Sequence, residues 1–369
     1  MKRYTVLELI FITSVFFLQT SFANPSGIPK NCEPNKECLQ ELAGAVCGDG
    51  TTSYFTVTSR PESKNLLIYF QGGGACWDFK SCAGGFAKSL TRVLPNNDWI
   101  GGKGIFNSKS ELNPYRRDTI ITVPYCTGDI FSGTRDATYE SGSVFKKVRH
   151  QGYRNTLLML DQVMQLYPNP ERIVMIGESA GGMGVLFHLR NVVKRFPRSE
   201  IYVLSDGGVP FKPPYVNEES FKNVMASWGA PTSRTATNLS ELAEENAKLY
   251  PEVRFGLIAS YFDYVMGFFA SQLGSPDIIN AVKNTLIDFS DHYIGLNRPN
   301  QRVFYFDGIT HTHLTGSLDA QSESESLSDW LKAMLSQHET SWENVRPDLH
   351  RDLSGAQLQA PVVQRPWME

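Results

Sequence analysis

The segment Ile173-Val-Met-Ile-Gly-Glu-Ser-Ala-Gly-Gly182 decides the fold of this chain. An apolar run ends at Gly177, Ser179 follows, and an amphipathic segment begins directly after Gly181. A strand, a sharp turn and a helix are the context that a G-x-S-x-G nucleophile elbow requires. A tight turn holds the serine hydroxyl out of main-chain hydrogen bonds, and glycines leave room where the two backbones crowd. The sequence therefore predicts that Ser179 is a nucleophile, with a small-residue packing turn as the alternative.

Short apolar runs alternate with helix-period segments along the rest of the chain. We expect strands at Asn65–Phe70, Thr119–Val123, Arg172–Ile176, Ile201–Ser205, Arg254–Ala259 and Arg302–Phe306. We expect helices at Tyr153–Tyr167, Gly182–Phe196, Asn238–Tyr250 and Leu327–His338. Uniformly apolar strands are typical of a sheet covered on both faces, so this alternation predicts an α/β fold with a mostly parallel central sheet and helices on both faces. Ligands of such sheets bind beyond the carboxyl ends of the strands.

The first 23 residues have the pattern of a secretory signal peptide. Lys2 and Arg3 precede the mostly apolar stretch Leu9–Leu18, and Ser21-Phe22-Ala23 offers small residues for cleavage. We therefore predict a mature chain that begins near Asn24 and is secreted or periplasmic, without stable membrane insertion. An uncleaved N-terminal anchor is the alternative.

The rest of the chain is predicted to form one domain over residues 24–340. Two stretches, at about 212–250 and 264–288, are expected as additions over the sheet, and residues 341–369 as an irregular tail. The composition is that of an ordinary globular protein, with 41% hydrophobic and 20% charged residues. A formal net charge of −3 gives no electrostatic reason to expect a nucleic acid as partner.

Six cysteines agree with export, because an even number in an exported chain suggests a disulfide framework. We predict three disulfides, Cys76–Cys82, Cys32–Cys38 and Cys47–Cys126. The first two pairs are close in sequence, and the third closes the remaining long loop. The cysteine spacings are not those of a zinc site, so we expect no metal there.

The glycine-rich segment Gln71-Gly-Gly-Gly-Ala-Cys-Trp-Asp78 directly follows a predicted strand. Glycines let backbone N–H groups approach a ligand closely. In a serine hydrolase of the α/β type, such a turn supplies one oxyanion-hole donor and the residue after the nucleophile supplies another. The predicted donors are Gly73 or Gly74 together with Ala180; a flexible turn without this role is the alternative.

The base and the acid must come later in the chain, because the order in this kind of triad is Ser, acid, His. The loop Ile309-Thr-His-Thr-His-Leu314 follows a predicted strand and offers His311, with His313 as the alternative. The acid is expected at Asp263, which follows the strand before that loop, with Asp206 as the alternative. Its role is to hold the histidine tautomer and to stabilise the imidazolium. The His-x-His pair has no evident third ligand, so a metal site is disfavoured.

Other segments that follow strand ends suggest a pocket. Pro124-Tyr-Cys-Thr-Gly-Asp-Ile-Phe-Ser-Gly133 places polar groups at the same end of the sheet, although Asp129 also suits a turn cap. The aromatic stretch Tyr261–Phe269 is expected either to pack a helix in the core or to line an acyl or sugar pocket. The predicted pocket-lining residues are Trp77, Tyr125, Asp129 and Phe262.

Taken together, these segments resemble the pectinacetylesterase family. The resemblance rests on Gln71–Asp78, Pro124–Asp129, His150–Asn155, Gly177–Gly182, Tyr261–Asp263 and His311–Leu314. It implies an α/β-hydrolase fold and a serine carboxylesterase that uses Ser179, Asp263 and His311. In plant and animal members a Trp precedes the Cys after the glycines, whereas here Ala75-Cys76-Trp77 stands, so the chain looks more like the bacterial branch.

We therefore expect a serine esterase that hydrolyses an O-acyl ester, with O-acetyl groups of pectin or another polysaccharide as the first candidate, and that needs no cofactor and no metal. One alternative is an esterase of lipids or long acyl chains, with the aromatic stretch as an acyl tunnel. The other is a catalytically silent binding protein on the same scaffold, because a fold does not determine a function.

Overall fold

An eight-stranded sheet forms the centre of the protein, in the order β1-β2-β4-β3-β7-β8-β9-β10. The computed structural model describes residues 29–30, 32–92, 102–231, 238–296, 298–336 and 342–348. The six strands from β4 to β10 in this order run parallel. β2 is antiparallel to β4, and β1 is antiparallel to β2.

The strands of the structure are β1 (Glu37–Val46), β2 (Thr52–Thr58), β3 (Asn65–Phe70), β4 (Thr119–Val123), β5 (Arg135–Ser141), β6 (Val144–His150), β7 (Arg172–Glu178), β8 (Glu200–Asp206), β9 (Arg254–Ser260), β10 (Gln301–Phe306), β11 (Gln321–Ser322) and β12 (Glu325–Ser326). The helices are α1 (Phe79–Ala83), α2 (Gly152–Leu166), α3 (Ala180–Arg195), α4 (Glu218–Trp228), α5 (Leu239–Leu249), α6 (Tyr264–Gln272), α7 (Ile278–Gly295) and α8 (Leu327–Leu335), with a short 3₁₀ turn at Gly104–Phe106.

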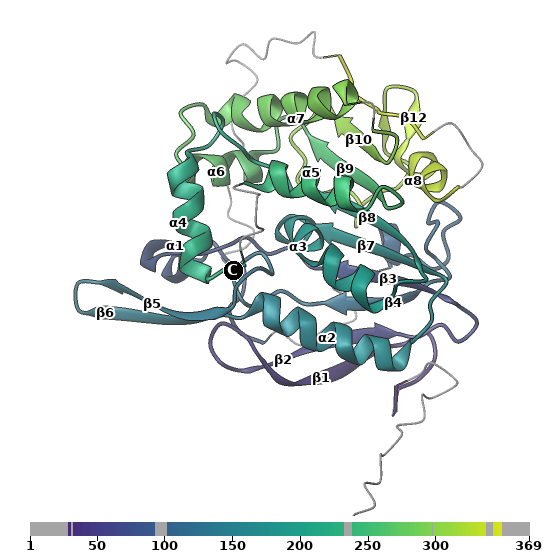
Figure 1. Ribbon diagram of the computed structural model, residues 1–369, viewed down its shortest axis with the longest axis horizontal. Coiled ribbons are helices and arrows are strands. Elements are labelled where there is room, and N and C mark those ends of the chain that lie inside the picture. The colour runs from purple at the N-terminus through teal and green to yellow at the C-terminus, as the bar shows by residue number, and fades with distance from the viewer. Residues whose placement is uncertain are drawn as a thin grey trace, which may run out of the picture.

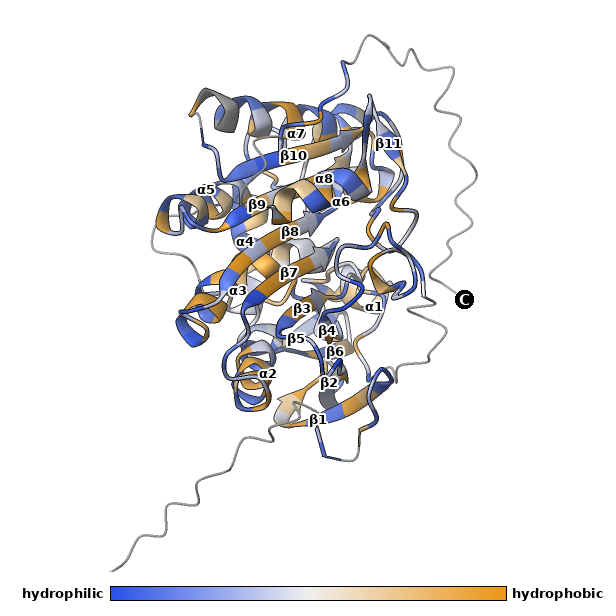
Figure 2. Ribbon diagram, turned by 90° about the vertical axis from the view of Figure 1, so that its right-hand side faces the viewer, coloured by the Kyte–Doolittle hydropathy of each residue, from blue (hydrophilic) through white to orange (hydrophobic). Residues whose placement is uncertain are grey.

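The two faces of the sheet are covered unequally. Figure 1 shows α7, α5, α3 and α2 following one another down the molecule, and their apolar sides, such as Leu160 of α2 and Leu189 of α3, belong to one large buried cluster. A second, smaller cluster on the other face contains Trp330 of α8 and Leu314. The middle parts of β7 and β8 are hydrophobic in Figure 2, as expected for strands buried on both faces. The predicted mostly parallel sheet with helices on both faces is confirmed.

All six predicted strands and four predicted helices are present, and their bounds shift by a few residues at most. β3 and β4 have the predicted bounds, whereas β7 continues to Glu178, next to the turn residue Ser179. α3 begins at Ala180, two residues before the predicted start, so the turn between strand and helix is tighter than the sequence indicated.

Three parts of the β-structure were not predicted, one of which is the short antiparallel pair β11–β12. β1 and β2 form an antiparallel edge of the sheet, and β5 and β6 form a separate two-stranded hairpin that projects from the body in Figure 1. For β1 and β5 the reason is a weak pattern, since β1 buries only two of its ten residues and β5 only one of seven. An exposed strand carries little of the apolar periodicity from which strands are recognised.

The expected additions and tail are seen in part. Residues 212–250 contain α4 and α5, and residues 264–288 contain α6 and the first part of α7. Of the tail, residues 342–348 are described, and Trp342 packs against Trp330 with ring centroids 5.7 Å apart. The domain limits stay predictions, and the predicted signal peptide at residues 1–23 lies outside the described residues. Within the described part of the chain, none of the helices has the length and apolar character needed to span a bilayer.

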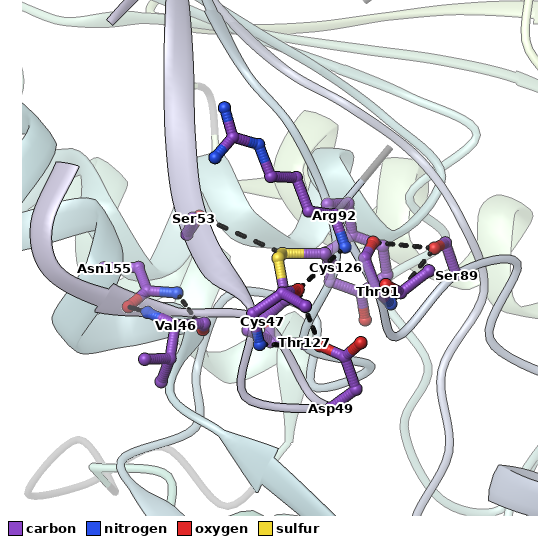
Figure 3. Close-up of a disulfide and its surroundings, with 12 residues drawn as sticks. Val46, Cys47, Asp49, Ser53, Ser89, Thr91, Arg92, Cys126, Thr127 and Asn155 are labelled. Atoms are coloured by element: carbon purple, nitrogen blue, oxygen red, sulfur yellow. Dashed lines mark hydrogen bonds between the residues drawn. A yellow bond between two sulfur atoms is a disulfide. The ribbon is translucent and has the colours of Figure 1, made fainter. Parts of the chain in front are cut away.

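The three predicted disulfides are present, as Cys32–Cys38, Cys47–Cys126 and Cys76–Cys82. Figure 3 shows Cys47–Cys126, which joins the residue after β1 to the loop after β4. Beside it, the Asn155 side chain of α2 donates to the Val46 carbonyl oxygen at 2.7 Å and accepts from the Val46 N–H at 3.2 Å. The disulfide and this amide together hold the antiparallel edge to the parallel part of the sheet.

We predict that Cys47–Cys126 contributes more stability than Cys32–Cys38. The two bridges close loops with sequence separations of 79 and 6 residues. In the chain-entropy model these loops correspond to about 4 and about 2 kcal/mol. The free energies of unfolding of the double variants Cys47→Ser/Cys126→Ser and Cys32→Ser/Cys38→Ser, from denaturant titrations, test the order. Equal losses would contradict it.

Candidate functional site

Ser179 occupies a strained turn between β7 and α3. Its backbone has φ 53° and ψ −117°, in the left-handed region that a residue with a side chain rarely adopts. The Ser179 N–H donates to the main-chain carbonyl of Asp206 at 2.7 Å, which ties the turn to the end of the neighbouring strand β8. Although Ser179 is the N-cap residue of α3, its side chain makes no capping hydrogen bond to the start of that helix. The strained turn between strand and helix agrees with the elbow pattern, and the role of Ser179 as nucleophile stays a prediction.

Glycines are required around this turn because backbones touch there. A Cβ atom on Gly177 would lie 2.0 Å from the carbonyl oxygen of Gly181, and one on Gly181 would lie 2.0 Å from the carbonyl oxygen of Phe70. A Cβ on Gly72 would come within 3.1 Å of the Ser179 Cβ. The end of β3, the glycine-rich segment after it and the start of α3 therefore meet at Ser179.

His311 and Asp263 form a buried pair at the same end of the sheet. His311 Nδ1 lies 2.6 Å from Asp263 Oδ2, and the Asp263 side chain is only 1% exposed. The second carboxylate oxygen, Oδ1, accepts the Met266 N–H at 3.0 Å and so caps the N-terminus of α6. The start of α6 therefore orients the Asp263 carboxylate, and the carboxylate orients the His311 ring through Nδ1. The other ring nitrogen, Nε2, does not take part in this pair.

The two alternatives left open by the sequence, His313 and Asp206, occupy different positions. His313 Nε2 lies 3.0 Å from the Ser260 hydroxyl, and its ring stacks on Phe306 at 4.0 Å. Asp206 is fully buried, and its Oδ2 accepts main-chain N–H groups at 2.7 Å rather than an imidazole. Only His311 and Asp263 form a histidine–carboxylate pair among these four residues.

The groups around His311 and His313 shift the pKa values of the two imidazoles in opposite directions. Burial alone would lower the pKa of His311, but the hydrogen bond to Asp263 and the negative charges of Asp263, Asp206 and Glu178 outweigh it and raise that pKa. For His313, burial and the neighbouring His311 lower the pKa to about 4. His311 is therefore the imidazole whose protonated form the site stabilises.

The glycine-rich segment after β3 lies against Ser179 at Gly72. Gly74 has φ 73°, and a Cβ on it would lie 1.9 Å from the Phe86 carbonyl oxygen. The Lys88 N–H donates to the Gly73 carbonyl at 2.7 Å, so the segment is held by the chain that follows α1. On the other side of Ser179, Ala180 is the first residue of α3, where N–H groups lack intrahelical partners. Gly73 and Gly74 thus belong to the segment that meets the serine turn at Gly72, and Ala180 directly follows Ser179; their role as oxyanion donors stays a prediction.

An aromatic surface borders the glycine-rich segment. Phe269 of α6 would lie 3.4 Å from a Cβ on Gly74, and its ring centroid is 6.5 Å from that of Trp77. The ring of Phe268 packs against Phe86 at 5.1 Å and is 41% exposed. We call Trp77, Phe86, Phe268 and Phe269 the aromatic wall. Because Asp263 caps α6, the same helix positions the carboxylate and two rings of this wall.

The other predicted pocket residues lie deeper. Tyr125 is buried beneath Gly73, with its ring 2.7 Å from where a Cβ on that glycine would be, and its hydroxyl accepts the Ile130 N–H. Asp129 is fully buried and its carboxylate accepts from Thr127, Phe131 and Gly152, so it holds the loop and the start of α2. Phe262 is 8% exposed and belongs to the large core cluster. Of the four predicted residues, Trp77 is the one in the aromatic wall.

Glu178 is a buried residue of the site that the sequence reasoning did not single out. It is 8% exposed and accepts a hydrogen bond from the Tyr69 hydroxyl at 2.5 Å. Its register partner on β8 is Asp206, so two carboxyl groups lie side by side at the ends of neighbouring strands. The signal in the sequence was a charged residue at the end of an otherwise apolar strand.

Two other features of the structure do not add to this site. Cys76, Cys82 and His150 lie within 4.8 Å of one another, but the sulfurs form a disulfide and both His150 nitrogens have partners at 2.8 Å. This cluster is therefore not a metal centre in the oxidised protein. A cavity of about 230 Å³ over β8, β9 and β10 is lined by residues other than Ser179, Asp263 and His311. It offers no nucleophile paired with a base.

Comparisons with known proteins show the family to which this chain belongs. The family model described as pectinacetylesterase matches residues 31–260. Palmitoleoyl-protein carboxylesterase notum2 of Xenopus laevis is 25% identical over 203 residues, which cover 52% of this chain and 40% of that protein. Pectin acetylesterase 5 of Arabidopsis thaliana is 26% identical over 243 residues, which cover 62% of this chain and 53% of that protein. The chain thus spans about half the length of these relatives, or less.

A solved structure is similar over most of its length. The structure of the Wnt deacylase Notum from Drosophila matches with a TM-score of 0.59 and 20% identity, covering 82% of this chain and 93% of that one. At this identity the likeness concerns the fold, and it confirms the predicted α/β-hydrolase fold.

We predict that Gly74→Ala destabilises the protein more than Gly85→Ala. Both glycines have positive φ, at 73° and 77°, so both substitutions strain the backbone by about 1 kcal/mol. Only at Gly74 does the new Cβ meet the Phe86 carbonyl, whereas nothing lies within 4 Å at Gly85. We expect Gly74→Ala to cost at least about 2 kcal/mol more in the free energy of unfolding. Equal losses in denaturant titrations would show that the glycine-rich segment is not held tightly.

Proposed function

Because the chain belongs to the pectinacetylesterase family, we propose that it is a secreted carboxylic-ester hydrolase in which Ser179 is the nucleophile, His311 the base and Asp263 the acid of a triad. The observation that carries this proposal is the buried His311–Asp263 pair at 2.6 Å, at the same end of the sheet as the strained turn of Ser179. The disulfides and the predicted signal peptide support an extracellular location.

The reaction follows from the roles of these groups. Ser179 Oγ attacks the ester carbonyl carbon while its proton passes to His311 Nε2. Asp263 keeps the other imidazole proton on Nδ1 and stabilises the imidazolium. The carbonyl oxygen becomes an oxyanion, for which we propose the N–H of Ala180 and that of Gly73 or Gly74 as donors, assisted by the N-terminal end of α3. His311 then protonates the leaving alcohol, and water releases the acid by the reverse sequence. These steps use the protein's own groups, with no cofactor or metal ion.

We propose an O-acetyl ester of a polysaccharide as the substrate, pectin being the first candidate. The relative from Arabidopsis is named a pectin acetylesterase. The aromatic wall supports the proposal from within the chain, because partly exposed rings such as Phe268 offer flat apolar surface beside the glycine-rich segment. The same surface suits a longer acyl chain. A long-acyl esterase is therefore the second candidate, and the relative from Xenopus is named a palmitoleoyl-protein carboxylesterase.

We predict that Ser179→Ala lowers kcat for a nitrophenyl ester by at least about 10⁴-fold, because no other group replaces the nucleophile. Labelling by a fluorophosphonate should also be lost. Ser227→Ala is the matched control, since its hydroxyl donates to the Val224 carbonyl in α4 and also interacts with Tyr139, and neither residue belongs to the proposed triad. Retained turnover in Ser179→Ala would refute the nucleophile, and a wild-type protein that neither hydrolyses nor labels would be a silent binding protein.

The same assay with nitrophenyl esters of increasing chain length separates the two substrate candidates. A maximum at acetyl, with acetate released from acetylated pectin by the wild type and not by Ser179→Ala, supports the polysaccharide substrate. A maximum at long acyl chains favours the second candidate.

We predict that kcat/KM falls as the pH drops through the raised pKa of His311, because only the neutral imidazole accepts the serine proton. The midpoint should lie above the ordinary histidine value of about 6.5. Asp263→Asn removes the charge that raises this pKa, so the residual activity should show a midpoint at lower pH and kcat should fall by about 10⁴-fold. Asp161→Asn, which removes an ion pair between α2 and Arg195 of α3, is the control. An unchanged midpoint in Asp263→Asn would contradict the pairing.

A further inference from the structure

Asp206 connects the two loops that carry the proposed nucleophile and base. It is the last residue of β8 and is fully buried. Its main-chain carbonyl accepts the N–H of Ser179 at 2.7 Å. Its side-chain Oδ2 accepts the N–H groups of His313 and Leu314, each at 2.7 Å. One residue therefore holds the serine turn with its backbone and the histidine loop with its carboxyl group.

Both loops adopt backbone conformations that need such support. Ser179 has φ 53°, and Thr312, directly after His311, has φ 64°. Non-glycine residues in this region persist only where the surroundings over-determine them. The residue after Asp206, Gly207, also limits the histidine, because a Cβ there would lie 3.2 Å from the His311 ring atom Cε1. The imidazole thus packs against the strand end from which the serine turn is tethered.

We infer that Asp206 is a positioning residue, which sets the place of His311 relative to Ser179 by bonding the backbone of both loops. The inference rests on the triad proposed above. It assigns Asp206 a role different from that of a triad acid, because the carboxyl group reaches main-chain N–H groups and not the imidazole.

The groups around Asp206 shift the protonation equilibrium of its carboxyl group. Glu178 of β7 lies beside Asp206 and accepts a hydrogen bond from the Tyr69 hydroxyl of β3. His311 faces Asp206 from the loop after β10. Asp206 Oδ1 is buried without a hydrogen-bond partner in the described structure. Burial and the negative charge of Glu178 raise the pKa of Asp206 to about 8, against the opposing effect of the two N–H donors and His311. Burial and Glu178 thus favour the neutral carboxyl group, in which one oxygen still accepts both N–H groups.

This form makes asparagine the conservative replacement. The amide oxygen of Asn can accept the same two N–H groups, and its NH₂ takes the place of the acid O–H. Asp206→Ala removes the acceptor altogether. Displacement of a catalytic group by about 1 Å costs on the order of 100-fold in rate. The rate should therefore distinguish Asp206→Ala, which loses the hydrogen-bond acceptor, from Asp206→Asn, which keeps it.

The test compares kcat, KM and the rate of Ser179 labelling by a fluorophosphonate in Asp206→Ala, Asp206→Asn and Asp118→Ala. Asp118 is a matched buried carboxylate that pairs with Arg172 at 2.7 Å. This pair lies where β4 and β7 begin, at the edge of the sheet opposite to Ser179. We expect Asp206→Ala to lose at least about 100-fold in kcat and labelling rate with KM within about threefold, and Asp206→Asn to stay within about tenfold of the wild type. Asp118→Ala should lose stability and keep kcat.

Two outcomes would overturn the inference. Folded Asp206→Ala with wild-type kcat and labelling rate would show that the histidine loop needs no such anchor. Asp206→Asn as inactive as Asp206→Ala would show that the carboxyl group acts by its charge. If Asp206→Ala does not accumulate as folded protein, Asp206→Ser replaces it, because its hydroxyl is too short to reach the loop and should cost at least about tenfold in kcat. A wild-type protein that neither hydrolyses esters nor labels refutes the proposed function itself, before any Asp206 variant is measured.

Discussion

Contact between backbones at the end of β7 is the constraint on which the rest of the site depends. Gly177, Gly181 and Gly182 bring the strand end and the first turn of α3 against β3 and β8, and a Cβ atom on any of them would lie within 2.6 Å of a neighbouring atom. This packing holds Ser179 in a left-handed conformation directly beyond the end of β7. It also brings the glycine-rich segment after β3 to the serine, because Gly72 abuts the same turn.

The parallel sheet supplies the other groups by placing the ends of its strands side by side. Asp206 is the last residue of β8, Asp263 follows β9, and the loop with His311 follows β10. These three strands are neighbours in the sheet. The carboxyl ends of parallel strands lie at one edge, so groups far apart in the chain meet there. α6 contributes to the site in two ways. Asp263 caps its N-terminus and orients His311. Phe268 and Phe269 in the helix contribute to the aromatic wall.

Three carboxyl groups lie around one imidazole, and the structure gives them different surroundings. Asp263 bonds the imidazole, Asp206 bonds backbone N–H groups, and Glu178 accepts from Tyr69. Burial raises the pKa of both Glu178 and Asp206, so this cluster carries less negative charge than its composition implies. The part that remains charged stabilises the imidazolium of His311, which the proposed reaction forms and consumes.

The sequence by itself determined the features that depend on local pattern. Apolar runs and helix periods located six strands and four helices, and the elbow motif located Ser179, because these signals come from neighbouring residues in the chain. The exposed strands β1 and β5 lacked that signal and were missed. Only the tertiary structure separated Asp263 from Asp206 and His311 from His313, since residues 48 and 107 positions apart meet through sheet order and loop packing. Pairing at that range is decided by which strand ends become neighbours, and no local pattern of residues carries that information.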